Sequence, residues 1–103
     1  MEYEKKLELL NQIINQIGEK ESFSLNRLLK DFIEDYAFIA SNESNRDIND
    51  VKIIPYVKKA VISAYNRLGV EGMKSSSEGS QSYSYEDIEE KLAKDVRSIR
   101  LLP

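Results

Sequence analysis

The 103-residue chain contains no cysteine and no histidine. Their absence excludes disulfides, thiolate nucleophiles, zinc sites built from cysteine and histidine, and acid–base catalysis by imidazole. Carboxylate and carbonyl oxygens are the metal ligands that remain. We therefore expect no enzymatic activity, no cofactor and no metal site.

Long apolar runs are missing as well. No stretch approaches the roughly 18 apolar residues that a membrane helix needs, and residues 1–6 lack the basic start of a signal peptide. We therefore expect a protein that stays inside a cell without membrane contact. The 15 basic and 18 acidic residues give a formal net charge of −3. This balance argues against a general nucleic-acid binder, because such proteins neutralise phosphates with cations.

The residues that are present suffice for one domain. Hydrophobic residues make up 41% of the chain, which supports a single modest core at this length. Apolar residues recur at helical spacing in four segments, at about residues 2–17, 24–40, 52–68 and 86–101. The pattern predicts an all-α fold, a small helical bundle of two long central helices with an N-terminal and a C-terminal helix. The polar segment 41–50 is predicted to be a loop.

Several residues mark where these helices start and stop. Gly18 is predicted to end the first helix, and Ser22 or Ser24 to cap the second. Pro55 fits the first turn of the third helix, where its missing N–H costs little. Gly69 is predicted to cap that helix at its C-terminus in the left-handed conformation.

The stretch from residue 73 to 85 is rich in serine. Such a composition predicts a flexible loop, and its end alternates polar and aromatic residues that can form a short β-strand against a partner edge. The single domain 1–103 is thus expected to comprise a helical body (1–72), a loop (73–85) and a C-terminal helix or tail (86–103). Tyr83 and Tyr85 either bind a partner or pack back over the chain's own helices.

One motif resembles a calcium loop in part. Asn45, Asp47 and Asn49 have the spacing of its first three ligand positions. The match then fails, because Asp50 stands where glycine is required and Tyr56 where glutamate is required. A polar loop between helices explains these residues better.

A longer string points to a family. Residues 65–72 read YNRLGVEG and close the third helix; a serine-rich stretch and the Tyr83-Ser84-Tyr85 motif follow. This order resembles the head–tail connector family (gp6-like, head-completion adaptor) of tailed bacteriophages and related prophages. The resemblance covers residues 23–102, and its specific part lies at 65–88.

The resemblance implies a non-enzymatic structural virion protein. Copies would form a ring, twelvefold in the portal context, that binds beneath the phage portal protein, extends the DNA channel and docks the tail or the next head-completion protein. DNA would pass through without sequence-specific binding. The protein would reside at the head–tail interface of the virion, and in the host cytoplasm during assembly.

The resemblance also implies roles for particular segments. Gly69 and its neighbours would shape the turn that leaves the third helix, the 73–85 loop would contact a neighbouring copy or the portal, and residues 86–103 would grip the portal. The residues expected at contacts with the portal or a neighbouring copy are Arg67, Glu71, Gly72, Lys74, Tyr83, Tyr85, Arg97 and Arg100.

An alternative reading is a small DNA-binding or antitoxin-like regulatory module. Lys58, Lys59 and Arg67 place cations on the third helix. A helix-turn-helix reader needs a short turn before its basic helix, and the segment 41–50 is too long for that. Salt-dependent binding to duplex DNA would distinguish the regulatory module from the connector.

Overall fold

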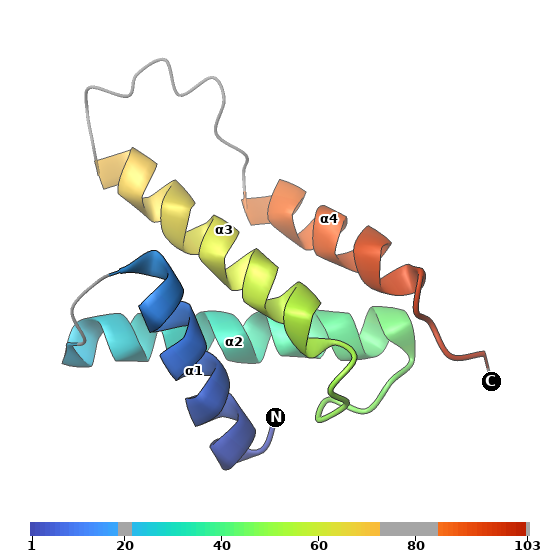
Figure 1. Ribbon diagram of the computed structural model, residues 1–103. Coiled ribbons are helices and arrows are strands. Elements are labelled where there is room, and N and C mark those ends of the chain that lie inside the picture. The colour runs from blue at the N-terminus through green and yellow to red at the C-terminus, as the bar shows by residue number, and fades with distance from the viewer. Residues whose placement is uncertain (19–21, 73–84, 103) are drawn as a thin grey trace.

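The computed structural model describes residues 1–18, 22–72 and 85–102. Within these ranges the chain forms four helices and no strand: α1 (Tyr3–Ile17), α2 (Phe23–Ser44), α3 (Ile54–Gly72) and α4 (Tyr85–Arg97) (Figure 1). The predicted all-α fold is confirmed. Of the predicted β-strand, residues 82–84 lie outside the described ranges, and Tyr85 is the first residue of α4. None of the described helices is long and apolar enough to cross a membrane.

The C-terminal end of α1 and the start of α2 lie where the sequence predicts them. Gly18 adopts a left-handed conformation with a φ of 73°, and its N–H donates to the carbonyl of Ile14. Ser22 caps α2, because its Oγ accepts a hydrogen bond from the N–H of Leu25 at 3.1 Å. Both predicted helix signals are therefore confirmed, with Ser22 rather than Ser24 as the cap.

The α2–α3 connector, residues 45–53, is shorter than the predicted loop. Helix α2 continues to Ser44, which is fully buried and donates its hydroxyl to the carbonyl of Ala40 at 2.6 Å. Asn45 then ends the helix in a left-handed conformation with a φ of 54°. A side-chain bond to its own helix lets Ser44 remain helical, although serine is typical of loops.

Helix α3 differs from the prediction at its C-terminal end. It continues through Gly69 to Gly72, so the predicted cap at Gly69 is wrong. A glycine inside a helix costs only about 1 kcal/mol relative to alanine, and no proline follows to force a stop. Pro55 does lie in the first turn, as predicted.

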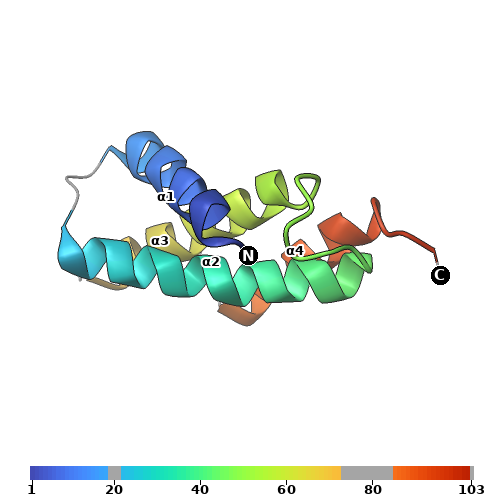
Figure 2. The same cartoon turned by 90° about the horizontal axis from the view of Figure 1, so that it is seen from below.

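All four helices share one core. Helix α2 contacts the other three, α1 also packs on α3, and α3 packs on α4 (Figures 1 and 2). The core of the described residues is apolar apart from Ser44. Its hydrophobic members are Leu9, Leu10, Ile13 and Ile14 of α1, Leu29, Ile33, Tyr36, Ala37 and Ala40 of α2, Ile53 of the connector, Val57, Ala60, Val61 and Ala64 of α3, and Ile88, Leu92 and Val96 of α4.

The C-terminal helix belongs to this core. Ile88, Leu92 and Val96 are between 0% and 6% exposed, so α4 is a structural member of the bundle. Only residues 98–102, which follow the helix, extend along the surface as a short C-terminal segment. The division of the domain into a helical body (1–72), a loop (73–85) and a C-terminal helix or tail (86–103) stays a prediction.

Candidate functional site

The C-terminal segment is held by the α2–α3 connector. The N–H of Leu101 donates to the carbonyl of Ser44 at 2.9 Å, and the side-chain amide of Asn45 donates to the carbonyl of Leu101 at 3.1 Å. Arg46 adds a bond from its Nε to the carbonyl of Ile99 at 2.7 Å. Three bonds therefore fix the segment at the C-terminal end of α2.

The same connector holds the N-terminus. The N–H of Glu2 donates to Oδ1 of Asn49, and Nζ of Lys5 donates to the carbonyl of Asn49 at 2.8 Å. Asp47 accepts the N–H of Asn49 through Oδ1 at 2.8 Å. Of the polar residues that partly match a calcium loop, Asn45 and Asn49 thus bind distant parts of the chain, and Asp47 binds within the connector. No group of three or more acidic side chains within the described ranges could hold a metal ion.

Arg46 and Asp50 form the electrostatic centre of the connector. Nη1 of Arg46 lies 3.0 Å from Oδ2 of Asp50, and the two side chains are 12% and 23% exposed. Oδ1 of Asp50 accepts the N–H of Lys52 at 2.9 Å. The backbone bond from Lys52 and then the bond from Arg46 hold the pKa of Asp50 below its ordinary value. This is the chemistry of a structural ion pair, because both partners are already engaged.

A groove of about 580 Å³ lies between α3 and α4. The two helices run side by side in opposite directions (Figure 1). The groove has an apolar floor, cations from both helices and two carboxylates from α4. Its lining comprises Tyr56, Lys59, Ala60, Ser63, Asn66 and Arg67 of α3 and Asp87, Ile88, Lys91, Leu92 and Asp95 of α4.

The structure distributes the predicted contact residues over two places. Arg67 lines the α3–α4 groove and is partly buried. Arg97 ends α4 and Arg100 lies in the C-terminal segment, both exposed. The groove lining runs along α4 from Asp87 to Asp95 and includes neither Arg97 nor Arg100.

Three of the remaining predicted contact residues lie at the ends of helices. Glu71 and Gly72 are the last two residues of α3, and Tyr85 is the first of α4. Lys74 and Tyr83 lie outside the described residues. The Arg97 guanidinium binds Oε1 of Glu43 through two nitrogens, at 3.0 and 2.8 Å. Arg97 thus links α4 to α2 on the surface.

Two surface features were not predicted. The groove walls formed by Lys59 and Lys91 come from helices whose relative placement the sequence does not give. Phe38 is 61% exposed on α2. A signal for Phe38 did exist, because it falls outside the apolar stripe of that helix and follows Glu34 and Asp35. An aromatic residue on the charged side of an amphipathic helix indicates a contact beyond the chain's own core.

Comparison with known proteins places the chain in a family. The family model of the phage gp6-like head-tail connector protein matches residues 1–100. This range includes α1, which lies outside the resemblance that the sequence motifs carry. Searches of curated proteins and of solved structures gave no match. Members of a head–tail connector family are structural components of the phage virion that associate with other head and tail proteins. The chain belongs to the phage gp6-like head–tail connector family.

Proposed function

We propose that this chain is a non-enzymatic ring subunit that binds beneath the portal of a phage head. The ring extends the DNA channel and docks the tail or the next head-completion protein. The observation that carries the proposal is the family match over nearly the whole chain. The serine-rich residues 73–84, in this proposal, contact the portal or a neighbouring copy through residues such as Lys74 and Tyr83.

The charge balance supports a channel that lets DNA slide. Proteins that hold DNA do so with lysine and arginine side chains at phosphates, and affinity rises with the number of these contacts. We infer that a channel dense in such contacts would hold the duplex tightly and impede its passage. The net charge of −3 is compatible with a lumen that makes few of these contacts. The proposal therefore expects few cations to face the lumen, and an assembled ring with a lumen dense in lysine and arginine would contradict it.

We assign the portal contact to the C-terminal segment. Leu101 and Leu102 are 45% and 85% exposed, beside the exposed Arg100. Two leucines in water next to a cation form a small contact surface of mixed character. The bonds from the connector hold the backbone of the segment in place, which lowers the entropy lost on binding.

The test uses a chain that carries Leu102→Asp and Arg100→Glu. We expect attachment to portal-bearing heads that lack this protein to fall by about tenfold or more, because exposed apolar and arginine anchors dominate such contacts. Cosedimentation of the purified chain with the heads measures it. The matched control is Phe23→Asp, which changes an 81% exposed residue at the other end of α2.

The outcomes distinguish the portal contact of the C-terminal segment from the connector role itself. The control should attach like the native chain, and both variants should unfold at the native urea concentration, because all three side chains are exposed. Full attachment of the double variant would remove the C-terminal segment from the portal contact. Failure of the native chain to attach would contradict the connector role itself. Micromolar, steeply salt-dependent binding to duplex DNA would instead support the regulatory module.

A further inference from the structure

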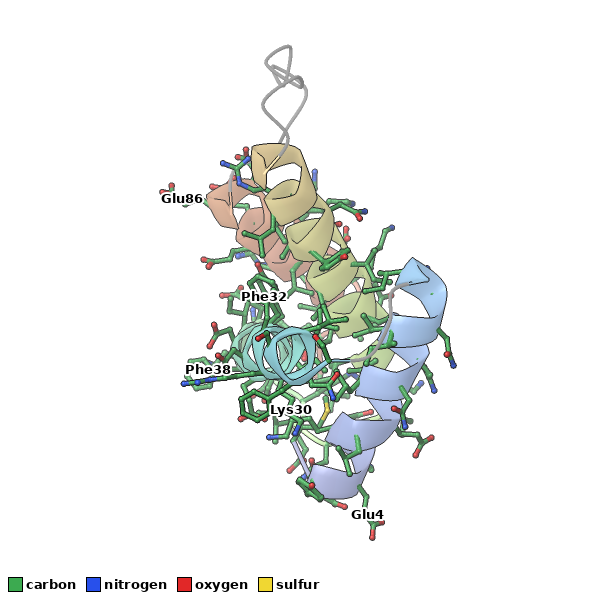
Figure 3. The ribbon with its side chains drawn as sticks, turned by 90° about the vertical axis from the view of Figure 1, so that its left-hand side faces the viewer. Glu4, Lys30, Phe32, Phe38 and Glu86 are labelled. Atoms are coloured by element: carbon green, nitrogen blue, oxygen red, sulfur yellow. The ribbon has the colours of Figure 1, made fainter. Side chains whose placement is uncertain are left out.

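The exposed face of α2 presents one aromatic ring among carboxylates. Phe38 is 61% exposed, and Figure 3 shows it pointing away from α1. Asp31 and Asp35 are exposed and lie seven and three residues before it, on the same side of the helix. Glu34, which binds Lys6 at 3.0 Å, flanks them. We call Asp31, Glu34, Asp35 and Phe38 the acidic aromatic face.

The α3–α4 groove has the complementary character. Ala60, Ile88 and Leu92 are apolar and nearly buried beneath it. Its volume of about 580 Å³ is in the range of pockets that hold organic groups. The α3 side of the lining contributes two cations, Lys59 and Arg67, and no carboxylate. Lys91 of α4 pairs with Asp95 at 3.2 Å, and Asp87 lies on the same wall.

The two surfaces cannot meet within one copy. No residue of α2 lines the groove, and Phe38 points outward from its helix (Figure 3). A closed ring joins each subunit to the next through two different patches, one on each side. An aromatic ring among acids and an apolar groove with a cationic wall are suited to be such a pair.

We propose that Phe38 of one copy inserts into the α3–α4 groove of the next copy in the ring. Asp31 and Asp35 then face Lys59 and Arg67 of that neighbour. This inference rests on the proposed ring and names the contact that closes it. The ring of Phe38 leaves water on insertion, and the opposite charges fix the register of the two helices.

The first test is self-association of the full chain. Phe38→Ala should weaken it by about tenfold or more, as for a central aromatic anchor, and added salt should weaken the native contact further. Sedimentation equilibrium measures the association constant. Phe23→Ala is the matched control, since Phe23 is also an exposed phenylalanine of α2. Both variants should keep the native unfolding midpoint.

The second test uses the absence of natural cysteine. Asn42→Cys keeps Phe38 and changes an exposed residue four positions after it on the same side of α2. Asn42→Cys and Ser63→Cys are made in separate chains, mixed at the highest soluble concentration and oxidised. Ser63 is exposed and lines the groove, so a disulfide-linked dimer is expected on a denaturing gel. Phe23→Cys mixed with Ser63→Cys should give almost none.

The outcomes test the contact between Phe38 and the groove separately from the proposed connector role. Equal cross-linking of the two mixtures, or none in either, overturns the contact between Phe38 and the groove. Native attachment to heads together with that result would leave the connector role intact. Protection of Ser63→Cys from a thiol reagent only on addition of purified portal protein would assign the groove to the portal and also overturn the contact.

Discussion

At the scale of single residues, the fold depends on polar bonds between segments far apart in the chain. Arg46 joins the connector to the C-terminal segment through Ile99, and Asn49 joins it to the N-terminus. Local pattern could predict that Tyr36 belongs to the core, and it is 2% exposed. It could not predict the partners of Arg46, because such bonds depend on where distant segments meet.

The ion pair of Arg46 and Asp50 predicts a pH dependence of stability. The pKa of Asp50 is lower in the folded chain than in the unfolded chain, where it is about 3.9. Its ionised form therefore stabilises the fold above that value, and the contribution is lost as the pH falls through the folded pKa. Between neutral pH and about pH 3, the urea midpoint of the native chain should fall more than that of Asp50→Asn.

The control for this experiment is Asp31→Asn, an exposed carboxylate on α2 outside the connector. Its urea midpoint should follow the native pH curve. Parallel curves for the native chain and Asp50→Asn would show that Asp50 contributes no pH-dependent stability. Arg46→Ala should lower the midpoint at neutral pH as well, because it also leaves the carbonyl of Ile99 without its guanidinium donor.

At the scale of elements, the sequence predicts that a helix exists better than it predicts the residues at which the helix begins and ends. Apolar periodicity located all four helices, because a buried stripe at a period of 3.6 is read directly from local sequence. It placed the end of α2 too early, since Ser44 was assigned to a polar loop although its side chain is buried in the core. It also ended α3 at Gly69, although the helix continues to Gly72 and a glycine inside a helix costs only about 1 kcal/mol.

The cap of α2 gives a prediction at this scale. Ser22→Ala removes the acceptor for the N–H of Leu25 and should lower the free energy of unfolding by about 1 kcal/mol, the typical value for a lost N-cap. Ser24→Ala tests the other serine that the sequence offers as a cap and should cost less. Urea unfolding followed by circular dichroism measures both, and an equal loss would show that the hydroxyl of Ser22 is not the dominant cap.

At the scale of the whole molecule, α4 decides whether the chain folds. Full burial of Ile88, Leu92 and Val96 contributes about 1.5–3 kcal/mol for each side chain. A domain of this length has a total stability of about 5–15 kcal/mol. Loss of α4 therefore removes an amount comparable with the whole stability.

Truncation after residue 72 tests this conclusion. We expect the fragment 1–72 to lose cooperative unfolding and to show far weaker helical circular dichroism per residue than the full chain. Deletion of residues 102–103 alone is the control, because Leu102 is 85% exposed, and it should unfold like the native chain. A fragment with a sharp, native-like urea transition would show that residues 1–72 fold without α4.

The hold of the connector on the C-terminal segment has a mechanical consequence. A pull on Pro103 reaches the backbone at Leu101, whose N–H and carbonyl bind Ser44 and Asn45. The tension then passes into the C-terminal end of α2, the longest of the described helices, which contacts the other three. Force applied at the end of the chain is thereby shared across the bundle before it can unwind α4.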